Sequence, residues 1–485
     1  MMRRAIVLSE VRITVSGEGG EEKNISAPVG AGFLQLLKMN GHPLTCCNGK
    51  GSCGRCRIQF LEGAPLPTAS DRLALTPQQL REGYRLACMH SAKKACRIRE
   101  AFVHPQEVKI LSSYEGAALT NKAPEEYVIA IDLGTTTIAM HAVELESICA
   151  YDVGKSLCVT DTYSVQNPQR RWGSDVISRI SEAKAGHAEE LKATVQAAVH
   201  TGIETLIKRA GRNPAKICLA GNTVMEHLFL GLDPSGLGEY PFTPVSLEEQ
   251  RCGQICLLPG ISAYVGADIL AGMLACGFGR ERKDKARLLI DLGTNGEMAL
   301  EYGDRLLCTA TAAGPAFEGG ASANVPGTDM VAILASLLQE GAMDDTGLLQ
   351  GAYFDAGWKC GALCVRQQDI RALQMAKAAI RAGIELMLER MGISYDEVEE
   401  VYLAGGFGYY LDVNAAASIG LFPADLAKKA RAVGNTALLG AALYAGKEEM
   451  RTLAGELTAR AEGMNLAEEE AFEELYLGNL NFDNA

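Results

Sequence analysis

A group of cysteines near the N-terminus constrains the chain more than any other feature. Three of them follow the pattern Cys47-x5-Cys53-x2-Cys56 in a glycine-rich stretch, and a fourth, Cys88, lies farther along in the phrase RLACM. Thiolates in such a loop are ligands that iron and sulfide prefer, and glycines let backbone N–H groups approach the sulfur atoms. The spacing therefore predicts a 2Fe–2S cluster held by these four residues.

Alternative interpretations of these cysteines stay open. A zinc site is one, although zinc sites usually combine two short Cys-x2-Cys pairs and the second pair is missing here. Cys46 competes with Cys47 as the first ligand, but its spacing to Cys53 is one residue longer, which favours Cys47. We interpret Cys96 as structural, and we expect His90 to lie near the cluster without binding it.

The charge of the chain is unevenly distributed. The net charge is −13, yet the first 100 residues are basic and the rest is strongly acidic. Such asymmetry favours two domains with different surfaces, and the acidic bulk argues against nucleic acid as a partner. The basic residues near the cysteines, among them Lys50, Arg55 and Arg85, are better explained as offsetting an anionic cluster.

The location of the protein is predicted from what the sequence lacks. The 15 cysteines are odd in number and no export signal precedes them, so a disulfide framework is not expected. No run of about 18 apolar residues is present, as a membrane helix requires. We therefore expect a cytoplasmic protein with no membrane partner.

Hydrophobic patterns divide the chain into domains. Val11, Ile13 and Val15 alternate as in a strand, and Phe33 and Leu37 have helical spacing. Strand, helix, cysteine loop and strand suit an α+β domain of β-grasp type. The predicted organisation is a ferredoxin-like domain over 1–100, a linker over 101–124 and an α/β domain over 125–485, with lobes at about 125–285 and 286–450 and a tail at 451–485.

The second domain contains an internal duplication. The apolar strands YVIAIDLG and RLLIDLG each end in Asp-Leu-Gly, and each is followed by a polar turn and another strand. Later in each half, a further strand ends in Leu-Ala-Gly, at 219–221 and 403–405. The repeated order of elements predicts two similar α/β lobes.

The two Asp-Leu-Gly turns have the composition of phosphate-binding hairpins. Asp132 and Asp291 end their strands, where a carboxylate can hold a water molecule on Mg²⁺. The following glycine lets the turn approach a phosphate, to which hydroxyl and N–H groups then donate. A glycine-rich turn, AGGFG, follows the strand near residue 403 and would leave a flat surface for an adenosine.

In this order the motifs resemble the family of acetate and sugar kinases, Hsp70 and actin. The resemblance implies a two-lobed actin-like ATPase that binds Mg-ATP. It implies catalytic roles for Asp132 and Asp291. It also implies a nucleotide site made of Gly134, Thr135, Thr136, Thr137, Gly293, Thr294, Asn295, Gly405, Gly406 and Gly408.

The two domains together resemble the reductive activators of corrinoid proteins. The stretches NPQRRWGSDVISRI, GNTVMEHLFLG, GPAFEGG and RQQDIRALQMAKAAIRAGI also read like that family. The resemblance implies ATP-dependent reduction of Co(II) to Co(I) in a partner corrinoid protein, with an external reductase or reductant supplying the cluster. Longer members carry an extra small domain where this chain has a short linker. The oligomeric state is left open, a homodimer included.

Several of these stretches have a simpler interpretation. Asn222 and Thr223 suit a helix cap, and Trp172, His141 and the apolar face of 366–384 suit core packing. The loops at 167–180 and 314–320 are expected to line the cleft or face the partner. Three alternative functions remain: an ATP-driven electron donor to another low-potential metalloenzyme, a small-molecule kinase with a regulatory cluster, and an electron-transfer scaffold switched by ATP.

Overall fold

The computed structural model describes most of the chain, with gaps. The described residues are 10–16, 22–40, 44, 56–75, 77–100, 117–120, 125–149, 157–280, 285–293, 295–311, 327–360 and 363–482. They form two compact units: one contains the described residues up to Glu100 together with 170–179, and the other contains the rest. No helix within these ranges is long and apolar enough to cross a membrane.

The first unit is a mixed five-stranded sheet with a helix packed on it. Its strands, in the order β2-β1-β5-β3-β4, are β1 (Glu10–Ser16), β2 (Glu22–Pro28), β3 (Arg57–Glu62), β4 (Tyr84–Leu86) and β5 (Cys96–Glu100). Its helices are α1 (Phe33–Met39), α2 (Ala69–Ala74) and α3 (Pro77–Arg81). Ile13 and Val15 are buried as the alternation predicts, and Phe33 packs edge-on against Phe60.

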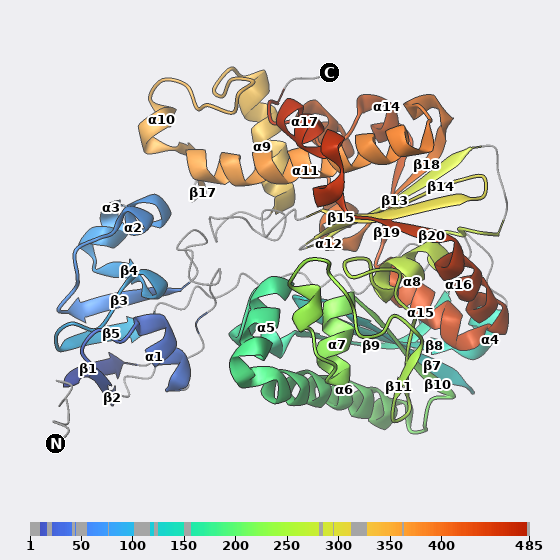
Figure 1. Ribbon diagram of the computed structural model, residues 1–485, viewed down its shortest axis with the longest axis horizontal. Helices are drawn as coiled ribbons and strands as arrows, with labels where there is room; N and C mark the ends of the chain where they lie inside the picture. The colour runs from blue at the N-terminus through green and yellow to red at the C-terminus, as the bar shows by residue number, and fades with distance from the viewer. Residues whose placement is uncertain are drawn as a thin grey trace, which may run out of the picture. The chain divides into compact units, whose positions relative to one another are not determined.

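The second unit contains two larger sheets (Figure 1). The first, in the order β11-β12-β10-β7-β8-β9-β6, has the strands β6 (Ala117–Leu119), β7 (Tyr127–Leu133), β8 (Thr137–Glu144), β9 (Leu157–Gln166), β10 (Lys216–Gly221), β11 (Gln250–Cys252) and β12 (Ile255–Leu257). The second, in the order β19-β18-β13-β14-β15-β20, has β13 (Ala286–Leu292), β14 (Gly296–Tyr302), β15 (Arg305–Thr311), β18 (Val398–Ala404), β19 (Ala430–Gly434) and β20 (Ala461–Met464). A separate hairpin joins β16 (Trp358–Cys360) and β17 (Leu363–Val365).

The two large sheets repeat one topology, which confirms the duplicated lobes. In each, a first strand forms an antiparallel meander with the next two, β7-β8-β9 and β13-β14-β15. In each, a later strand, β10 or β18, adds in parallel to the outside of the first. Strand β6 comes from the segment 101–124 that was expected to be a linker, and it pairs with β9.

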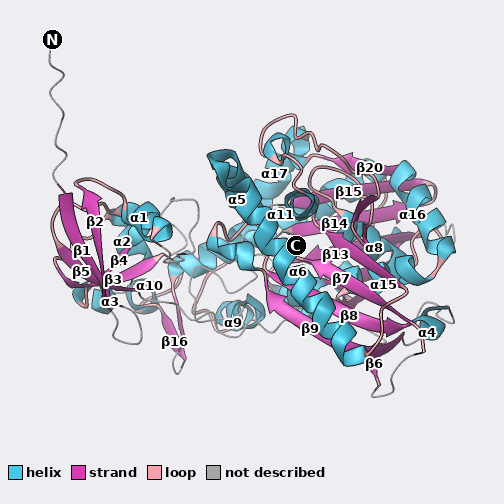
Figure 2. Cartoon of the chain, turned by 90° about the horizontal axis from the view of Figure 1, so that it is seen from below, coloured by secondary structure: helices cyan, strands magenta, loops and turns pink. Residues whose placement is uncertain are grey.

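Helices cover both faces of each sheet. Those of the first lobe are α4 (Leu145–Cys149), α6 (Ala188–Ala210), α7 (Thr223–Leu230) and α8 (Ala267–Ala275), and α5 (Val176–Glu182) begins in the segment 170–179 that belongs to the first unit. Those that follow are α9 (Gly327–Gln339), α10 (Tyr353–Ala356), α11 (Gln367–Met391), α12 (Gly405–Tyr410), α13 (Val413–Ser418), α14 (Ala424–Ala427), α15 (Thr436–Gly446), α16 (Glu448–Arg460) and α17 (Glu470–Gly478). The helix α6 packs against β8 and β9, and α11 packs against β14 and β15 (Figure 2).

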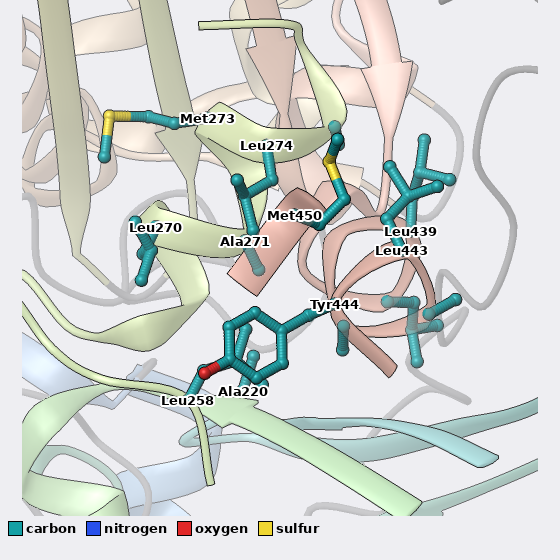
Figure 3. Close-up of a cluster of buried hydrophobic side chains, with 14 of the residues drawn as sticks. Ala220, Leu258, Leu270, Ala271, Met273, Leu274, Leu439, Leu443, Tyr444 and Met450 are labelled. Atoms are coloured by element: carbon teal, nitrogen blue, oxygen red, sulfur yellow. The ribbon is translucent and has the colours of Figure 1, made fainter. Parts of the chain in front are cut away.

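The helices α8 and α15 form the core between the two sheets. They cross closely enough that a Cβ on Gly440 would collide with the backbone of Ala271. Leu270, Leu274 and Leu443 fill the surrounding space (Figure 3). One hydrophobic cluster joins strands of both lobes through these helices.

Candidate functional site

In the first unit, two of the four predicted cluster ligands lie within the described residues. Cys56 directly precedes β3, and Cys88 lies in the short 3-10 turn after β4. The N–H of Ala87 donates to the carbonyl oxygen of Cys56 at 2.7 Å, which ties the two segments together. Cys47, Cys53 and the rival Cys46 lie outside the described residues.

A buried carboxylate organises the segment that carries Cys88. Asp71 is fully buried in α2 and accepts hydrogen bonds from the backbone N–H of Leu86 at 2.8 Å and of Thr68 at 2.7 Å. Its Oδ2 also lies 2.6 Å from His90 Nε2. Burial alone would raise the pKa of Asp71, but the hydrogen bonds from His90, Leu86 and Thr68 outweigh it and lower the pKa to about 2. Sequence reasoning missed Asp71, since nothing in the local pattern distinguishes it from an ordinary capping residue.

Cys96 is the nearby cysteine that we interpreted as structural. It begins β5 and is 8% exposed. Burial raises the pKa of its thiol to about 11, which disfavours the thiolate that a metal requires.

In the second unit, the two predicted catalytic aspartates occupy equivalent positions. Asp132 is the penultimate residue of β7 and lies in register with Ala220 of β10. Asp291 is the penultimate residue of β13 and lies in register with Ala404 of β18. Each therefore projects from the same end of its sheet, beside a strand that continues into a glycine.

The predicted phosphate turns are tight, and hydrogen bonds from Asn167 hold the first of them. A Cβ on Gly134 would lie 2.8 Å from the carbonyl oxygen of Thr137, so the β7–β8 turn requires glycine there. Buried Asn167 donates from Nδ2 to the carbonyl oxygen of Gly134 at 2.9 Å, and its own N–H donates to that of Thr136 at 2.8 Å. The NPQ stretch therefore holds the first turn in place. In the second turn, the N–H of Gly293 donates to the carbonyl oxygen of Asn295 at 3.0 Å, and Thr294 lies outside the described residues.

The AGGFG stretch adopts a different local structure from the flat turn that was expected. Residues Gly405 to Tyr410 form the helix α12, which begins directly after β18. Gly405 has φ +78°, and a Cβ there would collide with Asp291 Oδ1 and the carbonyl of Leu292. The glycine thus lets the start of α12 approach Asp291.

Three further carboxylates and two asparagines accompany the aspartates, and sequence reasoning missed their role. We call Asp132, Glu226, Asp268, Asp291 and Glu297 the acidic set. Asn435 Nδ2 donates to Asp132 Oδ2 at 2.7 Å and thereby links the start of α15 to the first lobe. Asn222 caps α7 as expected, and it also donates from Nδ2 to Glu297 Oε1 at 3.3 Å. Both asparagines follow a strand that ends in glycine, a repeated signal that was available in the sequence.

Burial raises the pKa of every member of the acidic set, and the charge of other members adds to the effect in all of them except Asp268. Burial, and after it the charges of Asp268 and Asp132, raise the pKa of Asp291 to about 8. Burial raises the pKa of Asp132 to about 7 despite the hydrogen bond from Asn435, and that of Asp268 to about 6. It raises the pKa of Glu226 and Glu297 well above their ordinary values, with the charge of Asp268 as the next cause. A cation bound near the acidic set would therefore stabilise its ionised carboxylates.

The acidic set does not by itself form a metal cage. Among the described residues, no three histidine, cysteine or carboxylate side chains are grouped closely enough to hold a metal ion. One oxygen of Glu226, Oε1, is buried without a hydrogen-bond partner. This donor chemistry fits Mg²⁺, which keeps most of its water molecules and takes its other ligands from substrate phosphates.

Comparisons with protein-family models match nearly the whole chain. The model of a 2Fe-2S iron-sulfur cluster binding domain matches residues 16–93. The model of the RACo middle region matches 127–281, and that of the C-terminal domain of RACo, the ASKHA domain, matches 285–325 and 323–485.

Curated relatives agree with these matches. The corrinoid activation enzyme RamQ of Eubacterium limosum is 31% identical over 432 residues, which cover 73% of this chain and 70% of RamQ. The [Co(II) methylated amine-specific corrinoid protein] reductase of Methanosarcina barkeri is 27% identical over 286 residues, which cover 47% of this chain and 52% of the reductase.

A solved structure supports the fold. The reductive activator for corrinoid,iron-sulfur protein superposes with a TM-score of 0.63 at 22% identity, covering 97% of this chain and 98% of the other. The predicted fold class, a ferredoxin-type domain followed by a two-lobed actin-like domain, is thereby confirmed.

Proposed function

Since the chain belongs to the family of reductive activators of corrinoid proteins, we propose that it reduces the Co(II) corrinoid of a partner protein to Co(I), in a reaction coupled to ATP hydrolysis. The electron would come from a 2Fe–2S cluster, which an external reductant or reductase reloads. The observation that carries the proposal is the combination, in one chain, of a matched 2Fe-2S domain with an actin-like unit whose two aspartates project from equivalent strand ends.

The cluster would be held by Cys47, Cys53, Cys56 and Cys88. The hydrogen bond between Ala87 and Cys56 supports this set, because it joins the segments of two ligands. When bound, the cluster supplies one electron at low potential. The protein's own contribution is to fix the Cys88 segment through Asp71 and to surround Cys56, which is 1% exposed, with apolar side chains.

The nucleotide would bind through both lobes. Gly134 to Thr137 and Gly293 to Asn295 would receive the phosphates on their backbone N–H groups and hydroxyls, and Gly405, Gly406 and Gly408 would face the adenosine. Asp132 and Asp291 would hold water molecules of Mg²⁺ and orient the attacking water. Their raised pKa values support this role, because a divalent cation relieves the repulsion within the acidic set.

ATP binding would draw the lobes together. The hydrogen bonds Asn435–Asp132 and Asn222–Glu297 join elements of the two lobes at this point. Mg-ATP bound by both turns would favour the closed arrangement, and hydrolysis would release it. This cycle supplies the free energy that the demanding reduction to Co(I) requires.

An anaerobic spectroscopic experiment tests the proposal. The protein with its cluster is mixed with titanium(III) citrate, Mg-ATP and a cobalamin-loaded corrinoid protein from the same genome, and the visible spectrum is followed. We expect an ATP-dependent Co(I) band that is lost in Cys53→Ala and in Asp291→Ala. Matched controls are Cys96→Ala, which removes a buried non-ligand cysteine, and Asp425→Ala, which removes a surface carboxylate paired with Lys428.

The outcome also separates the alternatives. A 2Fe–2S spectrum with ATPase activity but no Co(I) from any candidate corrinoid protein would contradict the corrinoid assignment and favour an ATP-driven donor to another low-potential metalloenzyme. Phosphorylation of a sugar or carboxylate would identify a kinase instead.

A further inference from the structure

Two cysteines away from both predicted sites lie side by side in the first lobe. Cys218 of β10 and Cys256 of β12 are paired residues of neighbouring parallel strands. Residues in register across a sheet point to the same face, and neighbouring strands are roughly 4.8 Å apart, within the Cα separation that disulfides span. The register alone therefore makes these two thiols candidates for a covalent bond.

The two thiols influence each other's pKa. Interaction with Cys218 is the main cause that lowers the pKa of Cys256, and interaction with Cys256 is the main cause that raises the pKa of Cys218. Burial and Glu249 oppose the effect on Cys256, while Arg451 supports it. The lowered pKa favours Cys256 as the attacking thiol and leaves Cys218 as the resolving thiol.

Polar side chains gather around the pair at the edge of the core. Tyr444 donates from its hydroxyl to Glu249 Oε2 at 2.5 Å, and Arg451 Nε donates to the carbonyl oxygen of Tyr444 at 3.3 Å. The Tyr444 ring lies beside Ala220 and Leu258, each two residues beyond one of the cysteines (Figure 3). A purely structural pair of small core residues would not require this polar surround.

The buried pair lies close to the edge of the sheet. Cys218 is 0% and Cys256 is 5% exposed. The strand β12 lies between β10 and β11, and β11 is a three-residue strand at the edge of the sheet. Short edge hairpins open at low free-energy cost compared with global unfolding. Opening of residues 250–257 would expose Cys256 before Cys218.

We propose that Cys218 and Cys256 form a redox-active dithiol that closes to a cross-strand disulfide by exchange with small-molecule disulfides. The Cys256 thiolate attacks oxidised glutathione, which forms a mixed disulfide and releases one glutathione thiolate. The Cys218 thiolate then attacks Cys256 Sγ and releases the second. Two protein thiols are oxidised, one glutathione disulfide is reduced, and the two protons pass to the two glutathione thiolates. This inference does not depend on the proposed function.

The test uses the full-length protein with its cluster. After anaerobic incubation with oxidised glutathione, the protein is quenched in acid, alkylated and digested with trypsin. Cleavage after Lys216 and Arg251 puts Cys218 in one peptide and Cys252, Cys256 and Cys276 in the next. We expect a linked pair of these peptides, lighter than their sum by two hydrogens, which dithiothreitol separates.

Cys252 provides a matched control on the same hairpin. It faces the other side of the sheet, where Gln196 Nε2 donates to its sulfur at 3.7 Å. Cys252→Ser should keep the linked peptides, whereas Cys218→Ser and Cys256→Ser should lose them. Wild-type protein that yields only alkylated Cys218 and Cys256 would overturn the proposal. A link that persists in Cys256→Ser would overturn it as well, because it would involve Cys252 or Cys276.

Discussion

At the scale of single residues, Asp71 gives the clearest prediction for the first unit. Asp71→Asn retains the size of the side chain but replaces one acceptor oxygen with an NH₂ donor. That donor then faces a backbone N–H, of Leu86 or Thr68, or the ring nitrogen of His90, so a hydrogen bond to the carboxylate is lost. We expect faster loss of the cluster from the folded protein and a shift of its reduction potential, because the Cys88 segment loses its anchor. The decay of visible absorbance and a redox titration measure both effects.

The control for Asp71→Asn is Asp412→Asn. Asp412 caps α13 with two backbone hydrogen bonds, so its substitution makes the same chemical change in the other unit. Equal cluster lifetimes in Asp71→Asn and Asp412→Asn would show that Asp71 is only a helix cap.

The acidic set predicts how the second unit responds to pH. The folded-state pKa of Asp291 is about 8, above the ordinary value of 3.8, so its stabilising contribution is complete below about pH 4 and is lost as the pH rises through about 8. The melting temperature of the nucleotide-free second unit should therefore fall as the pH rises from 5 to 8. Mg-ATP should restore it. Calorimetry at several pH values measures the trend.

Asp291→Asn tests whether the Asp291 carboxylate causes the pH dependence of stability. The neutral amide removes a buried charge, so at pH 8 we expect the nucleotide-free variant to be more stable by about 2 kcal/mol, with a weaker pH dependence. A variant with the wild-type slope would mean that other groups cause the loss of stability.

At the scale of elements, the crossing of α8 and α15 depends on one glycine. Gly440→Ala puts a methyl group against the backbone of Ala271, which cannot rotate away as a side chain can. We expect a loss of about 2–4 kcal/mol in the free energy of unfolding. Gly455→Ala is the matched control in the next helix: a Cβ there meets nothing within 4 Å, so the change should be neutral or stabilise by about 1 kcal/mol. Denaturant unfolding compares the two.

The elements that sequence analysis predicted well are those with a strong local pattern. The strands at 127–134 and 287–293 appear as β7 and β13, and the face with Ile370, Leu373 and Ile380 is buried in α11 as expected. The ends of strands and the turns after them follow from composition, so the positions of Asp132 and Asp291 at strand ends were predicted, whereas their catalytic role stays a prediction. The helix α12 was missed because a run of glycines gives no helical signal.

The rest of the candidate site could not be read from spacing. Asn435 and Asp132 are 303 residues apart and meet only because α15 runs between the two sheets. Asp268 has no motif of its own and acquires its position from α8. Lys377 lies on the buried face of α11, where its Nζ donates to the carbonyl of Asn481 and lies over the Phe482 ring. Tertiary contacts of this kind leave no trace in a local pattern.

At the scale of the whole molecule, each unit has its own hydrophobic core. We therefore expect two calorimetric transitions rather than one. Removal of the cluster with a chelator should lower only the first unit's transition, and Mg-ATP should raise only the second's, since a ligand stabilises the state that binds it. A single transition that both treatments shift together would contradict this expectation.

The acidic set of the second unit has a consequence for when the protein acts. Free ATP brings more negative charge to carboxylates that already repel one another, whereas ATP with its Mg²⁺ brings less. Under the proposed function, the lobes would therefore close on ATP only when Mg²⁺ accompanies it. ATP alone would then start neither hydrolysis nor transfer of the electron.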